Sequence, residues 1–172
     1  AEDTLYLFVG IDRTSEFAVT QPVDKAGKMA AARFLRDLIA AVPYRLHTVL
    51  TDNGVQFTNR SCDISAFEHI FDRVCRKQEI EHRLTDVKPP RTDGQVERMN
   101  RTIKDATLER FHSDDHNQLR IHLSAVMAAY NFARRLKTPG GLTPYEYICK
   151  IWTSEPDRFI LNPIHQMPGL NT

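Results

Sequence analysis

The chain has 172 residues, 41% of them apolar and 26% charged, and its 23 basic side chains nearly balance 22 acidic ones. This length predicts one domain with a sizeable core, and no apolar run approaches the roughly 18 residues that a membrane-spanning helix needs. Three widely spaced cysteines without a CxxC pair argue against a disulfide framework or a structural zinc site, and they indicate a reducing, cytoplasmic setting.

The first half of the chain predicts a hairpin, a helix and a third strand. Residues 4–12 and 16–23 are rich in β-formers and are separated by a short polar break, which indicates two antiparallel strands. Residues 25–42 carry apolar side chains at helical spacing and stop at Pro43. Residues 47–52 form a short apolar strand that ends in Asp-Asn-Gly, a turn signal. The apolar face predicted for the helix comprises Met29, Phe34, Leu35, Leu38 and Val42.

The second half alternates helices with one more strand and a loop. Residues 64–78 predict a helix with Phe67 on its apolar face, and 80–85 predict a strand. Residues 87–94 predict a loop, because two prolines and Asp-Gly break both kinds of element. Further helices are expected at 95–111, at about 115–136 with Tyr130 in the core, and at 143–152.

This succession of strands and helices indicates an α/β fold, with a mixed sheet flanked by helices. We place the folded core at 1–154 and expect an extended, proline-containing tail at 155–172.

The near-neutral total hides an uneven distribution of charge. Residues 1–24 carry one arginine against five acids, a net charge of −4, and the rest of the chain carries +5. The richest stretch, 73–110, holds ten Lys and Arg against seven acids. A phosphate backbone responds to local basic density more than to total charge, although such stretches also occur on ordinary solvated surfaces.

Two carboxylates stand where a catalytic site would form. Asp52 ends an apolar strand, and sites in open α/β sheets lie at the carboxyl ends of strands, although an Asp there can also cap its own turn. Glu97 opens a helix, where it could serve as a capping or helix-dipole residue, but basic residues crowd the same two turns. Two such carboxylates suit a pair of Mg²⁺ or Mn²⁺ ions acting on a phosphodiester. No Gly-rich phosphate loop, GxSxG or HExxH supplies a competing chemistry.

Several segments together resemble the catalytic core of bacterial insertion-sequence transposases of the retroviral-integrase type. The resemblance spans nearly the whole chain and is carried by LYLFVGIDRTSEFAVTQPV (5–23), TDNGVQF (51–57), PRTDGQVERMNRTIK (90–104) and YNFARRLKTPGGLTPYEYI (130–148). It implies a ribonuclease H-like fold for the core at 1–154. It also implies a two-metal Asp-Asp-Glu site that hydrolyses and transfers DNA strands at the ends of a mobile element.

The resemblance also implies roles for single residues. Asp52 and Glu97 match the second and third acids of the triad and would hold Mg²⁺ or Mn²⁺. Asn53 and Gly54 would shape the turn beside Asp52. DNA, at the element ends and in the target, and further copies of the chain are the implied partners, with no membrane. The implied DNA contacts, mostly to phosphates, are Lys88, Arg91, Arg98, Asn100, Arg101 and Lys104.

The N-terminus departs from the family's pattern. In this fold three antiparallel strands precede the first helix, and the first strand carries the first catalytic Asp, whereas only two strands precede residue 25 here. We therefore expect that Asp to lie upstream of Ala1. The alternative is that Asp12 is the first metal-binding Asp, with strand 4–12 beside 47–52. A sheet without its first strand would have two unpaired edges, which a partner chain, a rearranged tail or a swapped strand would fill.

Three functions are therefore open from the sequence. The first is the core of a DNA transposase, which we favour for the parent protein. The second is a ribonuclease H-like nuclease without strand transfer. The third is an inert DNA-binding or oligomerisation fragment, because the triad of this chain is incomplete. Joining of a cleaved end separates the first from the second, and Mn²⁺ binding with cleavage separates both from the third.

Overall fold

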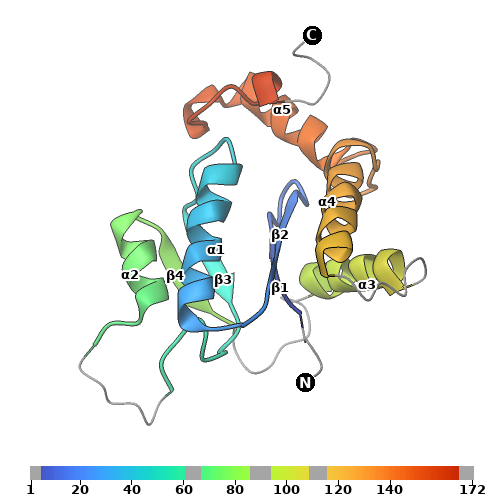
Figure 1. The fold of residues 1–172 in the computed structure, drawn as a ribbon. Coiled ribbons are helices and arrows are strands. Elements are labelled where there is room, and N and C mark those ends of the chain that lie inside the picture. Colours follow the sequence, from blue (N-terminus) through green and yellow to red (C-terminus); the bar gives the residue numbers. More distant parts are fainter. Residues whose placement is uncertain (1–4, 61–66, 86–93, 109–115, 167–172) are drawn as a thin grey trace. The chain divides into compact units, whose positions relative to one another are not determined.

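The computed structural model describes residues 5–60, 67–85, 94–108 and 116–166. Their contacts divide the chain into two compact units, one of Ala1–Phe8 with Gln21–Thr92 and the other of Val9–Thr20 with Asp93–Thr172. The N-terminal hairpin contributes residues to both units, and the other elements each belong to one (Figure 1). No helix in the described ranges is long and apolar enough to cross a membrane.

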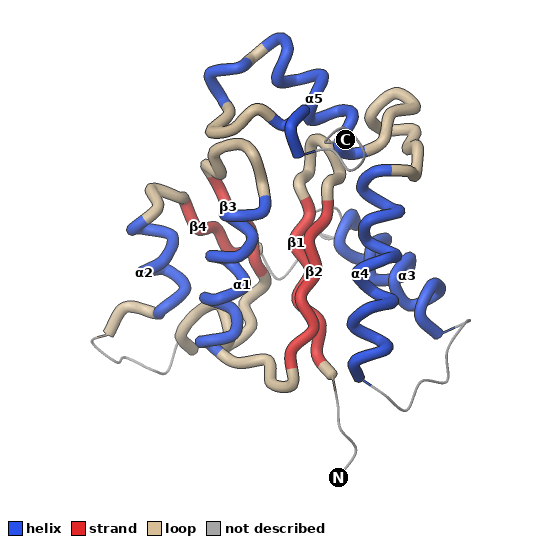
Figure 2. The backbone as a smooth tube through the Cα atoms, turned by 45° about the horizontal axis from the view of Figure 1, so that its top comes forward, coloured by secondary structure: helices blue, strands red, loops and turns tan. Residues whose placement is uncertain are grey.

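The hairpin predicted at the N-terminus is confirmed. Strand β1 (Tyr6–Ile11) pairs with β2 (Ala18–Val23), and the connection between them is short enough to allow only antiparallel pairing (Figure 2). The Asp12 N–H donates to the Phe17 carbonyl at 2.8 Å, which closes the loop. Glu16 takes a left-handed φ of 60° inside this loop, a conformation that non-glycine residues adopt rarely.

The other two strands form the scaffold of the first unit. Strand β3 (Thr48–Thr51) pairs in parallel with β4 (Glu81–Leu84), with Thr48 opposite Glu81 and Thr51 opposite Leu84. Parallel pairing brings the carboxyl ends of both strands to the same edge. Among the described residues, no hydrogen-bonded ladder joins this pair to β1 and β2. The fold is therefore mixed α/β, as predicted, with one antiparallel and one parallel pair.

Two helices accompany β3 and β4 in the first unit. Helix α1 (Lys28–Ala41) packs on α2 (Ile70–Lys77), and α2 packs on β4. An aromatic chain fills the interior: the Phe8 ring stacks on Phe34 at 5.5 Å between centroids, and Phe57 makes an edge contact with Phe71 at 5.3 Å. Burial of these rings supplies much of the apolar area that holds the unit together.

Two side chains predicted in this core are exposed instead. Met29 is 67% exposed, because the buried stripe of α1 centres on Ala31 and Leu35. Residues two positions apart in sequence point about 200° away from each other around a helix, so Met29 faces away from Ala31. Phe67 is 77% exposed, because α2 begins only at Ile70. The helix start is set by His69, whose Nδ1 accepts the Phe71 N–H at 3.1 Å.

The second unit is helical apart from its part of the hairpin. It contains α3 (Gly94–Leu108), α4 (His116–Phe132) and α5 (Pro144–Ser154). Met99, Ile103, Leu123 and Met127 form the centre of its core, and Tyr130 is buried there as predicted. Thr143 and Glu146 form a reciprocal capping box that fixes the start of α5.

The segment after α5 differs from the extended tail predicted from its prolines. Residues Pro156–Arg158 and Pro163–Gln166 form short 3₁₀ helices. The Tyr145 hydroxyl donates to the Pro163 carbonyl at 2.8 Å, and both residues are buried. Proline fixes φ at a value that suits a tight turn as well as an extended chain, so its frequency alone did not decide between them.

Asn131, at the end of α4, pairs with the backbone of β2. Its Oδ1 accepts the Ala18 N–H at 2.9 Å, and its Nδ2 donates to the Ala18 carbonyl at 2.7 Å. Ala18 is 1% exposed and Asn131 5%, so water does not satisfy these groups. The amide therefore stands in for a neighbouring strand at this position.

Candidate active site

Asp52 lies at the carboxyl edge of the parallel β3–β4 pair. It follows the last residue of β3, and its side chain is exposed. The Gly54 N–H donates to Asp52 Oδ1 at 2.8 Å, so the carboxylate is held by its own turn. In the described structure Oδ2 has no hydrogen-bond partner, which leaves it open to a ligand. Both sequence interpretations of Asp52, as a turn cap and as a site residue, are compatible with this geometry.

Asn53 and Gly54 give this turn its shape. Asn53 Nδ2 donates to the Thr85 carbonyl at 3.2 Å, and the Thr85 N–H donates to the Thr51 carbonyl at 2.8 Å, so the turn is fastened to the end of β4. A Cβ on Gly54 would lie 2.7 Å from Asp52 Oδ1, closer than real Cβ contacts come. A side chain at residue 54 would have to push the Asp52 and Gln56 side chains aside, so glycine suits the turn as it stands.

Glu97 lies in the first turn of α3 and is exposed. Met99 and Ile103, 2% and 5% exposed, anchor the helix in the core and turn Glu97 outward. The sequence also allowed an i,i+4 ion pair with Arg101, but neither side chain has an ion-pair partner in the described part of the chain. The carboxylate is thus free to take a ligand.

The predicted DNA contacts divide between described and undescribed positions. Arg98, Asn100, Arg101 and Lys104 are exposed on α3, around the same turns as Glu97. Lys88 and Arg91 lie outside the described residues. The side chains on α3 therefore present a basic surface next to an exposed carboxylate, as the local charge density predicted.

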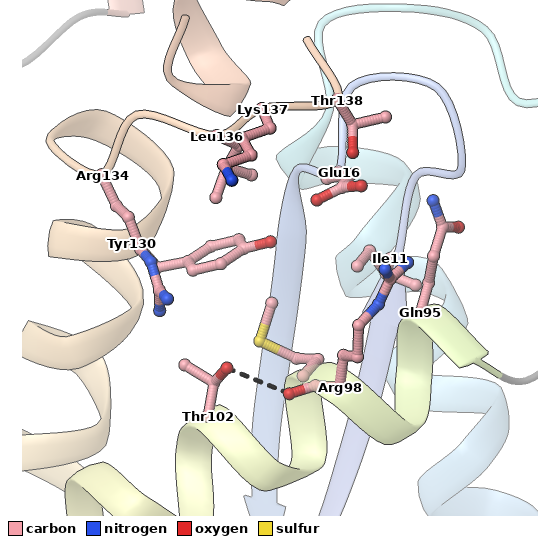
Figure 3. A pocket seen from close by; sticks show the side chains of 11 residues that line it. Ile11, Glu16, Gln95, Arg98, Thr102, Tyr130, Arg134, Leu136, Lys137 and Thr138 are labelled. Atoms are coloured by element: carbon pink, nitrogen blue, oxygen red, sulfur yellow. Dashed lines mark hydrogen bonds between the residues drawn. The ribbon is translucent and has the colours of Figure 1, made fainter. Parts of the chain in front are cut away.

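A pocket of about 180 Å³ opens beside the first turn of α3, within the second unit (Figure 3). Arg98, Arg134 and Lys137 bring positive charge to it, and Glu16 brings one negative charge. Tyr130 and Met99 form part of its apolar wall. Further polar side chains in the lining come from α3 and from the segment after α4: Gln95, Thr102 and Thr138. Lys137 and Glu16 were not predicted as site residues, because neither has a local sequence signal that links it to α3.

The pocket combines an aromatic wall with basic side chains. The Arg134 guanidinium lies over the Tyr130 ring, 5.9 Å from its centroid, as Figure 3 shows. Burial raises the pKa of Tyr130 to about 12, and the nearby Glu16 carboxylate adds to the increase. The Tyr130 hydroxyl therefore stays protonated at neutral pH and can donate to an anion. With three cations against one carboxylate, the pocket favours a phosphate group over a cation.

The carboxylate of Asp12 is engaged in the hairpin loop. Its Oδ1 accepts the Thr14 N–H at 3.1 Å, and its Oδ2 accepts the Ser15 hydroxyl at 2.6 Å. Ser15 is 2% exposed, and its Oγ also accepts the Phe17 N–H at 3.1 Å. Asp12 therefore orders the loop between β1 and β2, a role that the Asp-x-Thr-Ser spacing supports.

Asp52 belongs to the first unit and Glu97 to the second. No group of three or more His, Cys, Asp or Glu side chains gathers into a cation site among the residues described. The two carboxylates nevertheless offer exposed, uncommitted oxygens, the hard donors that Mg²⁺ and Mn²⁺ take, with waters and phosphate oxygens completing the coordination. Each of these carboxylates is, taken by itself, a chemically suitable ligand for a divalent cation.

Comparison with known proteins supports the fold. Residues 78–144, which include Glu97 and the α3 bases, match the family described as Integrase core domain. The crystal structure of the catalytic core domain of BIV integrase superposes with a TM-score of 0.65 at 23% identity, covering 86% of this chain and 88% of that one. A simian T-cell lymphotropic virus intasome chain gives a TM-score of 0.68 at 22% identity over 82% of this chain.

An uncharacterized protein of Caenorhabditis elegans is 27% identical over 99 residues, which are 58% of this chain. This chain spans 7% of the nematode protein and 47% of the simian viral chain. The two structural matches confirm the ribonuclease H-like fold of integrase catalytic cores that the sequence predicted.

Proposed function

We propose that this chain is the catalytic core of a DNA transposase of the bacterial insertion-sequence type, acting in the bacterial cytoplasm. It would hydrolyse phosphodiester bonds and transfer DNA strands at the ends of a mobile element. The observation that carries the proposal is Asp52, an exposed carboxylate held by a tight turn at the carboxyl edge of β3–β4 in an integrase-core fold. Glu97, within the segment that matches Integrase core domain, supplies a second exposed carboxylate.

Asp52 and Glu97 would hold Mg²⁺ or Mn²⁺, which when bound activates a hydroxyl and stabilises a leaving oxygen. The Gly54 N–H keeps Asp52 Oδ1 in place and leaves Oδ2 to bind. The exposed bases of α3 would position DNA through its phosphates without reading its sequence. Further copies of the chain are the other partners that we propose.

The first acid of the triad needs a separate assignment. Both carboxylate oxygens of Asp12 accept hydrogen bonds from its own loop, and these bonds hold the side chain in the hairpin turn. Of the two assignments that the sequence leaves open, Asp12 and an Asp expected upstream of Ala1, we favour the second, since Asp12 already orders its own loop.

Strand joining tests the proposed function directly. The purified protein is incubated with Mn²⁺, supercoiled plasmid and a labelled duplex with a free 3′-hydroxyl. We expect the label to join the plasmid, because the 3′ oxygen forms a bond to a plasmid phosphorus as that phosphorus loses its own 3′ oxygen. Cleavage without joining would favour the nuclease, and neither reaction would favour the inert fragment.

Removing the basic side chains of the pocket is expected to change how salt affects DNA binding. For Arg98→Ala and Arg134→Ala, the slope of log affinity against log salt should become shallower by about 0.9 for each phosphate that the variant no longer neutralises. Binding of a labelled duplex across a salt series measures this slope. Arg36→Ala, an exposed arginine on α1 outside the pocket, is the control. Slopes equal to wild type in both pocket variants would exclude the pocket from the DNA interface.

A further inference from the structure

A chain of hydrogen bonds runs from α2 through β4 to the end of β3, entirely within the first unit. Asp72 Oδ1 lies 2.5 Å from His82 Nδ1, and His82 Nε2 lies 2.8 Å from Thr51 Oγ1. The Thr51 hydroxyl also lies 3.1 Å from the main-chain carbonyl of Asp52. This series of hydrogen bonds therefore ends at Asp52, the residue that the proposed function places at the metal site.

The parallel register explains why these side chains meet. His82 stands opposite Val49, and Thr51 is two residues further along β3, so both side chains point to the same face of the pair. That face is covered by α2, whose first turn carries Asp72. The His82 side chain is 7% exposed and packs against the Phe71 ring at 4.8 Å. Burying a series of polar groups in such a mostly apolar layer costs free energy unless each group is hydrogen-bonded.

Three contacts link these groups in series. His82 Nδ1 faces the Asp72 carboxylate, and His82 Nε2 faces Thr51 Oγ1. The Thr51 hydroxyl also lies within hydrogen-bond distance of the Asp52 carbonyl, so it bridges the imidazole and the Asp52 main chain.

We propose that Asp72, His82 and Thr51 are positioning residues that hold the Asp52 main chain, so that its carboxylate presents Oδ2 to a divalent cation. This inference rests on the proposed function, which gives a reason for positioning the Asp52 carboxylate. The positioning by these hydrogen bonds can be tested whether or not that function is correct. Asp72 orients the imidazole, the imidazole orients the Thr51 hydroxyl, and the hydroxyl holds the Asp52 carbonyl. Partners that orient a metal ligand in this way commonly change metal affinity 10–100-fold when they are removed.

A purely structural role, in which the same bonds only fasten α2 to β4, makes a different prediction. It would lower stability without moving the Asp52 turn. The Gly54 amide separates the two roles, because its proton is donated to Asp52 Oδ1 at 2.8 Å and therefore reports the carboxylate position. Its resonance and its hydrogen-exchange rate are measured in the folded protein by nuclear magnetic resonance.

The decisive variants act on Thr51. Thr51→Val keeps the shape and removes the hydroxyl, and Thr51→Ser keeps the hydroxyl. Thr48→Val is the matched control, since Thr48 lies on the same strand and bonds across to Glu81 at its other end. We expect Thr51→Val to speed Gly54 exchange about fivefold, as for the removal of one hydrogen bond, and to weaken Mn²⁺ binding about tenfold. Thr51→Ser and Thr48→Val should behave like wild type.

The two readouts separate the positioning from the proposed function. An unchanged Gly54 amide in Thr51→Val overturns the positioning, whatever happens to Mn²⁺. A wild-type protein that binds no Mn²⁺ overturns the proposed metal site, and the Gly54 amide still decides the positioning. If Thr51→Val does not fold, Asp72→Ala breaks the same series of hydrogen bonds at its other end, where the Asp72 side chain is 40% exposed. The Gly54 amide is then measured in the same way.

Discussion

Replacing Asp52 by asparagine, or Glu97 by glutamine, is expected to reduce metal-dependent strand joining about a thousandfold. The amides keep the shape of the side chains but lose the charge that holds Mg²⁺ or Mn²⁺. Metal assistance stabilises a phosphodiester transition state by several kcal/mol, and about 4 kcal/mol corresponds to three orders of magnitude in rate. Both side chains are exposed, so neither change should alter folding.

The joining assay described above measures this loss, with Asp105→Asn as the control. Asp105 is an exposed carboxylate on α3, two turns beyond Glu97, and it carries no proposed role. We expect it to join strands at the wild-type rate. Urea midpoints should agree among all three variants and the wild type. Full activity in Asp52→Asn would remove this residue from the triad, and loss in Asp105→Asn as well would point to general charge near DNA instead.

The features that sequence predicted well are those set by neighbouring residues. The hairpin, the strand ending at Asp52 and the α3 stripe of Met99 and Ile103 all follow from local periodicity and turn chemistry. The loop role of Asp12 was not predicted, although Thr14 and Ser15 follow it at the spacing of an Asx turn.

The features that sequence missed depend on where a segment lies in the fold. Met29 has the helical spacing of a core residue, but only packing decides which side of α1 is buried. The pocket joins Glu16 to Lys137, residues far apart in the chain, and no pattern in either segment indicates the other. The His82–Thr51 contact depends on strand register, which a short apolar strand specifies weakly until its partner is known.

The amide of Asn131 is expected to contribute more to stability than any other polar side chain considered above. Asn131→Ala leaves the N–H and the carbonyl of Ala18 without partners at a position that is 1% exposed. Each buried, unsatisfied group costs about 1–3 kcal/mol, so the free energy of unfolding should fall by about 3 kcal/mol. For a urea m-value of about 2 kcal/mol per molar, the midpoint falls by about 1.5 M.

Asn100→Ala, at an exposed position on α3, is the control and should stay within about 0.5 kcal/mol of wild type. Equal midpoints for both variants would mean that water or a shifted backbone satisfies Ala18, and the strand-like role of Asn131 would be wrong. A drop confined to Asn131→Ala would support it.

The shape-matched change Asn131→Asp tests the donor half of the amide separately. The introduced carboxylate can still accept the Ala18 N–H, but it faces the Ala18 carbonyl without a proton to donate. Burial against that carbonyl should raise the pKa of the carboxyl above its unfolded value of about 3.9. The protonated carboxyl restores the hydrogen-bond donor. The stability that this hydrogen bond contributes is therefore fully present below the unfolded pKa and is lost as pH rises through the folded pKa. Relative to wild type at each pH, the variant should therefore be less destabilised near pH 4 than near pH 7. Equal destabilisation at both would show that the hydrogen bond to the Ala18 carbonyl contributes little.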